Sequence, residues 1–327
     1  MDLVLVLGGL ALLVAGGDIL VRGAVALSLR LGIPAIIVSA TVVAVGTSAP
    51  ELIISIQAAI EGAPGIALGN VVGSNIANVW LVLGIPALIA PLAGCGDDAR
   101  RSLYFMLAGT LLFTVFILSG SIPWWGGIAL IAVMAVMVWD SVRHSIEYRE
   151  QRQLRESVNA AANPNPPEDV AELEDVDPNM APWKIAGLIL LGVAMLPIGA
   201  QFLIDGARGV ATAMGVSEAA IGLTLVALGT SLPELATTVM AALRRQTDVA
   251  IGNVVGSNLF NITLIIGAAA AIAPLDVPRE FIERDIWIML AATAMVVPYV
   301  LLNRMLCRWT GGLFLFLYVG YAVIALS

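Results

Sequence analysis

The chain has 327 residues, of which 59% are hydrophobic and 12% are charged, and its net charge is −8. With a mean hydropathy of +0.95, this composition excludes a soluble domain, which needs far more charge to cover its surface. Apolar runs near the ~20 residues that a helix needs to cross a bilayer recur along the whole chain. The alternating polarity of a transmembrane barrel is absent from the sequence. We therefore predict an all-α polytopic membrane protein.

The apolar runs predict ten spans. The first run lacks a positively charged start and continues past the length of a signal peptide, so we interpret it as a retained span. The ten spans are predicted at 3–29, 34–60, 65–90, 103–120, 123–143, 184–212, 217–243, 247–273, 285–303 and 309–326.

One connection is much longer than the others. Residues 145–182 contain nine acidic residues and the proline-rich stretch 163–167. We predict a solvated acidic linker, with a short helical extension of the fifth span through Arg155. A regulatory cation site among its acids is a second, less favoured interpretation. The linker separates a first five-helix half, 1–144, from a second half, 183–327.

Basic residues indicate the orientation of the chain. If the N-terminus lies outside, twelve Lys and Arg residues fall on the inner side and only Arg279 and Arg284 on the outer side. This asymmetry predicts that both termini are outside and that the linker is cytoplasmic. The inner residues are Arg30, Arg100, Arg101, Arg143, Arg149, Arg152, Arg155, Lys184, Arg244, Arg245, Arg304 and Arg308.

The two halves share a repeated segment. Residues 41–84 align with 224–267 at a constant offset of 183, with 22 identities in 44 positions. Five spans per half is an odd number, so the second half is predicted to lie upside down relative to the first. Inverted repeats are the usual construction of secondary transporters, whose binding site lies near the midplane between the halves. The duplication therefore favours transport over an enzymatic function.

Each copy of the repeat places polar groups inside an apolar span. Pro50 and Pro233 are predicted to kink their helices and to free the carbonyl four residues earlier. Each following glutamate has a serine three residues and a threonine four residues before it, on one helix face. The two sets are Thr47, Ser48 and Glu51, and Thr230, Ser231 and Glu234.

The next span of each half carries an amide and hydroxyl stripe at intervals of four residues. The stripes are Asn70, Ser74 and Asn78, and Asn253, Ser257 and Asn261. Flanking glycines at 69, 73, 252 and 256 predict close approach of helices. Together the two halves offer an all-oxygen ligand set, which suits hard cations such as Ca²⁺. For a single asparagine, including Asn75 and Asn258, helix packing is an equally good interpretation.

Other chemistries have little support in the sequence. Cys95 and Cys307 are predicted to be reduced and to lack a motif for a disulfide or a metal. His144 is the only histidine, so a site built from imidazoles is excluded. Thr47 and Ser48 have no Lys or His nearby to act as a base, which argues against an intramembrane enzyme.

The two Gly-Thr-Ser-x-Pro-Glu segments, each followed by Gly-Asn-x-x-Gly-Ser, resemble those of the cation/Ca²⁺ exchanger superfamily. More narrowly, the chain resembles the prokaryotic sodium/calcium exchangers and their alpha repeats. The resemblance implies two inverted five-helix halves and a prokaryotic plasma (inner) membrane location. It also implies that the first and sixth spans slide across the core. In these spans, Asp18 with Arg22 and Asp205 with Arg208 are spaced to pair along a helix, beside a water-filled crevice or, less favoured, in an ion site.

The resemblance also implies a role for each motif residue. Glu51 and Glu234 would be the shared central ligands of Ca²⁺ and Na⁺, and Thr47 and Thr230 would flank them. Asn78 and Asn261 would line the middle of the cluster. The outer Na⁺ positions would be completed by Ser48, Ser74, Ser231 and Ser257 and by the carbonyls of Ala44 and Ala227. Potassium-dependent relatives carry Asp at the position of Asn261, so K⁺ transport is not expected.

We therefore predict an antiporter that exchanges Ca²⁺ for Na⁺ by alternating access, and not an enzyme. The alternatives are a Ca²⁺/H⁺ antiporter of the same fold and, more remotely, a cation channel. No cofactor is expected beyond the transported ions Ca²⁺ and Na⁺. The expected surroundings are the lipid bilayer, with no nucleic acid.

Overall fold

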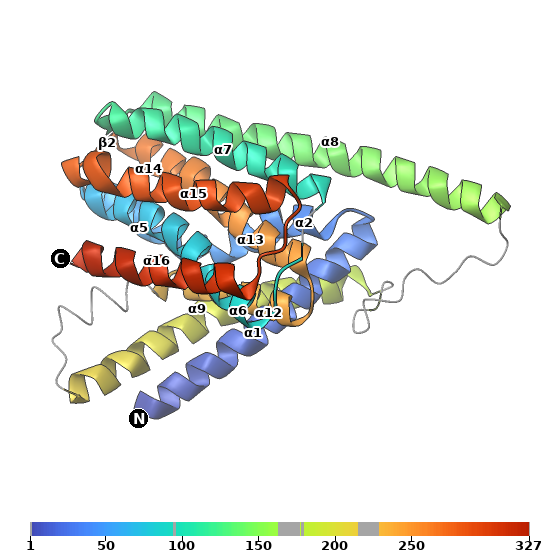
Figure 1. Cartoon of the computed structure of the whole chain (residues 1–327), viewed down its shortest axis with the longest axis horizontal. Coiled ribbons are helices and arrows are strands. Elements are labelled where there is room, and N and C mark those ends of the chain that lie inside the picture. The colour runs from blue at the N-terminus through green and yellow to red at the C-terminus, as the bar shows by residue number, and fades with distance from the viewer. Residues whose placement is uncertain (1, 94–95, 163–176, 178–179, 215–228, 327) are drawn as a thin grey trace.

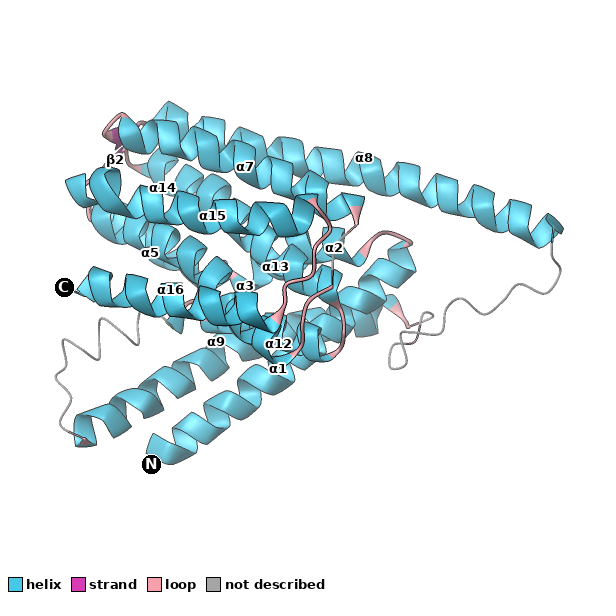
Figure 2. Ribbon diagram, in the orientation of Figure 1, coloured by secondary structure: helices cyan, strands magenta, loops and turns pink. Residues whose placement is uncertain are grey.

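The computed structural model describes residues 2–93, 96–162, 177, 180–214 and 229–326. Within them the chain is almost entirely helical, with one pair of two-residue strands (Figure 2). In the first half, with η marking π-helical segments, the elements are α1 (Asp2–Leu31), α2 (Ala35–Val38), η1 (Ser39–Val43), α3 (Ala44–Thr47), α4 (Ala49–Ile60), α5 (Pro64–Ala77), η2 (Asn78–Val82), α6 (Gly84–Ile89), α7 (Asp97–Leu118), β1 (Ser121–Ile122) and α8 (Trp124–Ala162).

The described elements of the second half are α9 (Pro182–Ala213), α12 (Leu232–Leu243), α13 (Thr247–Phe260), η4 (Asn261–Ile265), α14 (Ile266–Ile272), β2 (Leu275–Asp276), η5 (Phe281–Asp285), α15 (Ile286–Leu301) and α16 (Arg308–Leu326). The second half repeats the helices around the motif, but β2 precedes α15 whereas β1 follows α7. The bounds of α4, α5 and η2 recur in α12, α13 and η4 at the offset of 183 residues. The repeat in the sequence is therefore also a repeat of local structure.

Seven helices in the described residues are long and apolar enough to cross a membrane, or eight if the bent pair 35–47 and 49–60 is one span. Two shorter apolar helices, Leu232–Leu243 and Arg308–Ile324, lie where spans seven and ten are predicted. Part of the predicted seventh span falls outside the described residues. The several apolar helices fit a membrane protein, and the count of ten stays a prediction.

The centre of the bundle is formed by the helices that follow the repeated glutamates. In the most apolar window of 64–89, 72% of residues are buried, and in that of 247–272, 78% are. The corresponding values for α1, α8 and α9 lie between 22% and 33%. Every residue of α13 from Val249 to Phe260 is buried. The polar stripes of the repeat therefore lie on the most enclosed helices.

The helices α1 and α9 lie side by side along their length, at an angle to the main bundle (Figure 1). Their glycines recur every seven residues, at 9, 16 and 23 and at 192, 199 and 206. A methyl group on Gly199 would lie 3.0 Å from the Gly9 carbonyl oxygen, and one on Gly192 would lie 2.9 Å from that of Gly16. The two backbones are thus in contact, which larger residues would prevent.

Asp18 of α1 forms ion pairs within this region. It pairs with Arg22, at 3.0 Å as the spacing predicts, and with Arg244 at the end of α12. Asp205 of α9 accepts a hydrogen bond from Gln201 at 2.9 Å. The carboxylate of Asp18 therefore links α1 to the end of α12.

Short backbone contacts join loops at each end of the bundle. β1 pairs antiparallel with β2 at one end, and Leu92 bridges to Leu306 elsewhere. Both chain termini and β2 lie on the left in Figure 1, whereas the C-terminal end of α8 extends far to the right. The helix α8 continues to Ala162, beyond the Arg155 that the sequence predicts, so the first part of the linker 145–182 is helical. Most of the remainder lies outside the described residues.

Candidate cation-binding site

The second predicted span is broken at Ser48. The segment 35–47, which ends with α3, and helix α4 meet there at 51°, and Ser48 itself has φ −88° and ψ 12°. The predicted break of this span at its proline is confirmed, and it takes the form of a new helix start, because Pro50 lies in the first turn of α4. A proline is well placed there, since the first turn has no intrahelical acceptor for an N–H group. The carbonyl of Ala44 accepts from the Ser48 N–H at 3.0 Å, which closes α3.

The second half reproduces this helix start. α12 begins at Leu232, directly after Ser231, with Pro233 in its first turn. Thr230 and Ser231 therefore occupy the positions of Thr47 and Ser48. Ala227 lies outside the described residues, as does most of the segment before the motif. Of the predicted site residues, the structure describes all the others.

The two glutamates lie in the first turns of α4 and α12. Each is 1% exposed, and they are close enough to interact electrostatically. Ser48 Oγ donates to Glu234 Oε1 at 2.8 Å. The hydroxyl of Thr47 lies near the same carboxylate and donates to the Ala44 carbonyl at 3.3 Å and to Asn253 Oδ1 at 3.4 Å. Thr230 is the side-chain partner of Glu51. Each carboxylate is thus held by hydroxyls of the other half, so both halves are needed to build the centre.

Asn70 and Asn253 fix the backbone of the glutamates. Asn70 Nδ2 donates to the Glu51 carbonyl at 3.1 Å and to Ser55 Oγ at 2.9 Å. Asn253 Nδ2 donates to the Glu234 carbonyl at 3.4 Å and to Thr238 Oγ1 at 3.1 Å. The amide groups of these two residues therefore have a positioning role, which is the packing interpretation left open by the sequence.

The stripe residues Ser74, Asn78, Ser257 and Asn261 are also buried, with exposures of 0–4%. Asn78 and Asn261 begin η2 and η4 at the ends of α5 and α13. π-Helical turns are rare and frequent at functional sites, and the sequence pattern did not predict them. The wider turn interrupts the α-helical hydrogen-bond ladder next to the two asparagines.

Several buried oxygen atoms here have no hydrogen-bond partner among the described residues. Buried polar atoms are normally paired, because an unpaired group costs ~1–3 kcal/mol. Oxygen atoms of this kind suit a hard cation, which would satisfy their free lone pairs. The atoms are Glu51 Oε2, Glu234 Oε2, Ser231 Oγ, Ser257 Oγ, Asn78 Oδ1 and Asn261 Oδ1.

Asn75 belongs to this cluster although the sequence did not single it out as a ligand. Both polar atoms of its side chain are buried without a partner in the described part of the chain. The backbone carbonyl of Asn75 accepts a hydrogen bond from Asn258 Nδ2 at 3.3 Å, and Asn258 Oδ1 accepts one from Asn78 Nδ2 at 3.0 Å. This chain of amides joins α5 to α13. The available signal was its place next to Ser74 in the repeated motif.

Buried carboxylates, hydroxyls and amides between membrane-length helices define a cation transporter rather than an enzyme. The sequence profile of the family described as "Sodium/calcium exchanger protein" matches residues 1–142 and 184–327. The chain therefore belongs to the sodium/calcium exchanger family.

Individual relatives agree with this assignment. The chain is 31% identical over 342 residues to the sodium/calcium exchanger MaX1 of Methanosarcina acetivorans, covering 99% of this chain and 98% of the relative. It is 34% identical over 288 residues to the inner membrane protein YrbG of Escherichia coli, covering 88% and 84%. A solved structure of the sodium-calcium exchanger NCX_Mj, soaked with 10 mM Na⁺ and zero Ca²⁺, superposes with a TM-score of 0.78 at 28% identity, covering 100% of this chain and 99% of that one.

Proposed function

We propose that this protein exchanges Ca²⁺ for Na⁺ across the membrane by alternating access, with Glu51 and Glu234 as the shared ligands. The observation that carries the proposal is the pairing of two buried carboxylates across the halves. Each has one oxygen without a hydrogen-bond partner among the described residues. These oxygens provide the negative charge that a cation needs in an apolar surrounding.

Charge explains why such a site exchanges ions and does not leak. Two empty carboxylates in apolar surroundings repel each other and are costly to enclose. One Ca²⁺, or two or more Na⁺, offsets both charges. The protein therefore encloses the site only when cations are bound there. After one kind of ion has been released on one side, the empty site must bind the other kind before it can face the opposite side again.

The remaining ligands are proposed from the motif positions that the resemblance to the family implies. Thr47 and Thr230 flank the centre, and Asn78 and Asn261 line its middle. The outer sodium positions use hydroxyls and backbone carbonyls. They are assigned to Ser48, Ser74, Ser231 and Ser257 with the carbonyls of Ala44 and Ala227.

The proposed arrangement in the membrane has ten spans in two inverted halves, 1–144 and 183–327. Both termini lie outside and the linker 145–182 is cytoplasmic, in a prokaryotic plasma membrane. The basic residues support this orientation. So does the position of both termini at one end of the bundle, opposite the C-terminal end of α8 (Figure 1).

Sodium is proposed as the coupling ion. The relative MaX1 is named a sodium/calcium exchanger, and NCX_Mj was studied at varied Na⁺ and Ca²⁺ concentrations. Potassium is not included, because Asn261 offers a neutral amide in place of a carboxylate.

Gradient-driven Ca²⁺ uptake into vesicles that contain the purified protein tests the coupling. We expect uptake to follow an imposed Na⁺ gradient, to ignore a pH gradient and to be unaffected by K⁺. Uptake driven by the pH gradient alone would replace the proposal with Ca²⁺/H⁺ exchange. Ca²⁺ flux without any counter-ion would indicate a channel.

Variants of the two glutamates test the site in the same vesicles. Glu51→Gln or Glu234→Gln is expected to abolish exchange, since either removes half of the charge that attracts the cations. Glu61→Gln is the matched control, because Glu61 is an exposed glutamate at the end of α4. Exchange retained by either central variant would refute the assignment.

A further inference from the structure

A groove separate from the cation site opens between the C-terminal end of α1, the segment α2–η1 and α8. Its volume is about 350 Å³, within the range of small-molecule sites. The α8 wall runs from Val138 to Arg149, which is roughly 16 Å along a helix axis. We call it the α1–α8 groove.

The walls of the α1–α8 groove are apolar and accessible. Leu31, Val42, Val138, Val142 and Ile146 line it and are between 37% and 53% exposed. They lie where the first and fifth spans approach the membrane boundary on the linker side. A lipid chain is the natural neighbour of such a surface.

The hydroxyl groups on the walls are already satisfied locally. Thr41 Oγ1 donates to the Ile37 carbonyl at 2.6 Å, and Ser145 Oγ donates to the Ser141 carbonyl at 2.7 Å. A peptide in the groove would leave its own backbone groups unpaired, at a cost of ~1–3 kcal/mol each. A hydrocarbon chain has no such groups.

Arg149 supplies a cation at one end of the groove. Its side chain crosses the turn at Gly32, where an added methyl group would lie 3.6 Å from Arg149 Cγ. Arg149 has no ion-pair partner among the described residues, whereas Arg30 in the same region donates to the Met180 carbonyl. The side chain of Arg149 is therefore available to an anionic group outside the chain.

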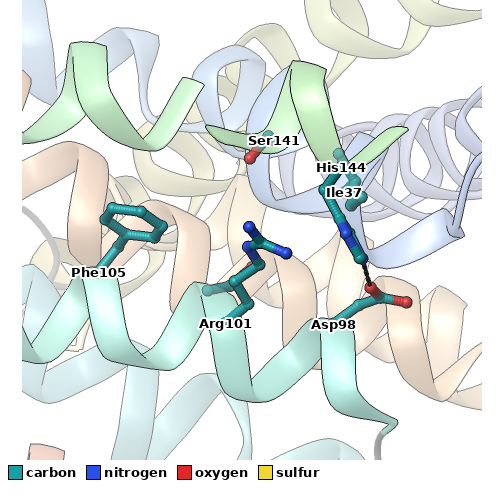
Figure 3. A pocket seen from close by; sticks show the side chains of 7 residues that line it. Ile37, Asp98, Arg101, Phe105, Ser141 and His144 are labelled. Carbon is teal, nitrogen blue, oxygen red and sulfur yellow. Dashed lines mark hydrogen bonds and ion pairs between the residues drawn. The ribbon is translucent and has the colours of Figure 1, made fainter. Parts of the chain in front are cut away.

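Several other charged residues near the groove pair with one another. Ile37 and Ser141 also line a small polar pocket, in which Asp98 points toward His144 (Figure 3). His144 Nε2 lies 2.7 Å from Asp98 Oδ1, and Arg101 Nη2 donates to Asp140 at 2.7 Å. On α8 itself, Glu147 lies 3.9 Å from Arg143.

We infer that the α1–α8 groove binds an anionic phospholipid from the leaflet on the linker side, with an acyl chain along Val138–Ile146 and its phosphate on Arg149. Basic groups beside apolar crevices between membrane helices are suited to anionic headgroups. Val38, Thr41 and Val42, which form one wall, belong to the segment α2–η1, and this segment continues directly into α3 (Ala44–Thr47). The bound lipid would thus contact the segment that ends at the cation site.

Native mass spectrometry of the full-length protein tests this with equimolar phosphatidylglycerol and phosphatidylcholine of matched chains. We expect the wild type to retain one phosphatidylglycerol about fivefold more than phosphatidylcholine. Arg149→Gln should remove this preference, and Arg143→Gln, the same change on the same helix outside the groove, should keep it. Equal preference in the two variants would overturn the inference.

Filling the groove tests the position of the chain. Val142→Trp should release both lipids, whereas Val136→Trp, on an exposed position of α8 outside the groove, should retain them. Equal retention of lipid by the two tryptophan variants would show that the lipid binds outside the α1–α8 groove. Excess glycerol phosphate should not displace the lipid, and displacement would indicate a free-anion site. The assay involves no transport, so its outcome is independent of the proposed exchange.

Discussion

Ser48 lies at the end of one broken helix and donates its hydroxyl to a carboxylate from the other half of the chain. Thr230 is the corresponding partner of Glu51. A hydrogen bond to a charged group contributes ~1.5–3 kcal/mol to stability. These contacts therefore fix the orientation of each carboxylate, with one of its oxygens accepting from a hydroxyl. The other oxygen of each has no hydrogen-bond partner in the described part of the chain and would bind the cation in the proposed site.

The buried charges of these residues predict a specific pattern of thermal stability. At 100 times its dissociation constant, Ca²⁺ should stabilise the wild type by about 2.7 kcal/mol. Glu234→Gln should lose this shift, because the amide carries no charge. In cation-free buffer the same variant should melt above the wild type, since one of two repelling buried carboxylates is gone. Scanning fluorimetry in detergent measures both effects.

The exposed Glu61 again provides the control for this measurement. Glu61→Gln should keep the Ca²⁺ shift and leave the cation-free melting temperature unchanged. A Ca²⁺ shift of wild-type size in Glu234→Gln would show that the ion binds elsewhere.

At the scale of elements, the two copies of the repeat pack differently although their sequences agree. A methyl group on Gly256 of α13 would lie 2.5 Å from Cα of Ala40 in η1, a backbone atom that has little room to move. A methyl group on Gly73 of α5, at the corresponding position, would meet nothing within 4 Å. The prediction that the flanking glycines permit close approach is confirmed at 252 and 256. It is wrong at Gly73, and a methyl group on Gly69 would make only an ordinary contact, 3.7 Å from Phe281 Cζ.

This difference predicts opposite effects for one substitution made in each half. Gly256→Ala should lower the melting temperature and reduce folded yield, because α13 and η1 must move apart. Gly73→Ala should be neutral or slightly stabilising, since alanine favours a helix over glycine by roughly 0.5–1 kcal/mol. Thermal unfolding of the two variants side by side measures the effects. Equal destabilisation would contradict the packing described here.

Much of the element pattern follows from the sequence, because span length and the period of the repeat are local properties. The carboxylate, hydroxyl and amide positions were predicted on the same basis. The cross-half contact of Ser48 with Glu234 was not, since it joins residues 186 positions apart. The π-helical turns at Asn78 and Asn261 were also missed, because a single extra residue in a turn leaves no mark in hydrophobic periodicity. α8 exceeds its predicted length because residues 145–162 are rich in Glu, Gln, Arg and Ala, which favour helix without an apolar periodicity.

At the scale of the whole molecule, the proposed orientation makes Cys307 a probe of sidedness. It precedes α16, is partly exposed and lies 3.4 Å from Thr310 Oγ1. The hydrogen bond from Thr310 lowers the pKa of the Cys307 thiol, so more reactive thiolate is present at neutral pH than for an ordinary cysteine. Leu306 next to it pairs with Leu92, which the proposed orientation also places on the cytoplasmic side.

In a Cys95→Ser background, a membrane-impermeant maleimide should label Cys307 in inside-out vesicles and not in intact cells. A cysteine introduced at Ser121 in β1 should show the reverse pattern, because β1 lies at the opposite end of the bundle in the proposed arrangement. Gel-shift labelling distinguishes the two. Labelling of Cys307 from outside would invert the proposed orientation.

The contact between α1 and α9 has a mechanical consequence. The helices meet where Gly9 faces Gly199 and Gly16 faces Gly192, with further close contacts at Gly23 and Gly206, so levels of contact recur about every 10 Å along their axes. Because the helices are in contact at several positions along their length, a change in the angle between them is opposed. We therefore expect α1 and α9 to move together as one rigid rod. A methyl group on Gly17 of that rod would lie 2.9 Å from the Ala236 carbonyl oxygen of α12, the helix that carries Glu234. In the proposed alternating-access cycle, a rigid pair that slides on this surface would shift both of its ends by the same distance. Uncovering the proposed site on one face of the membrane and covering it on the other would then be a single displacement.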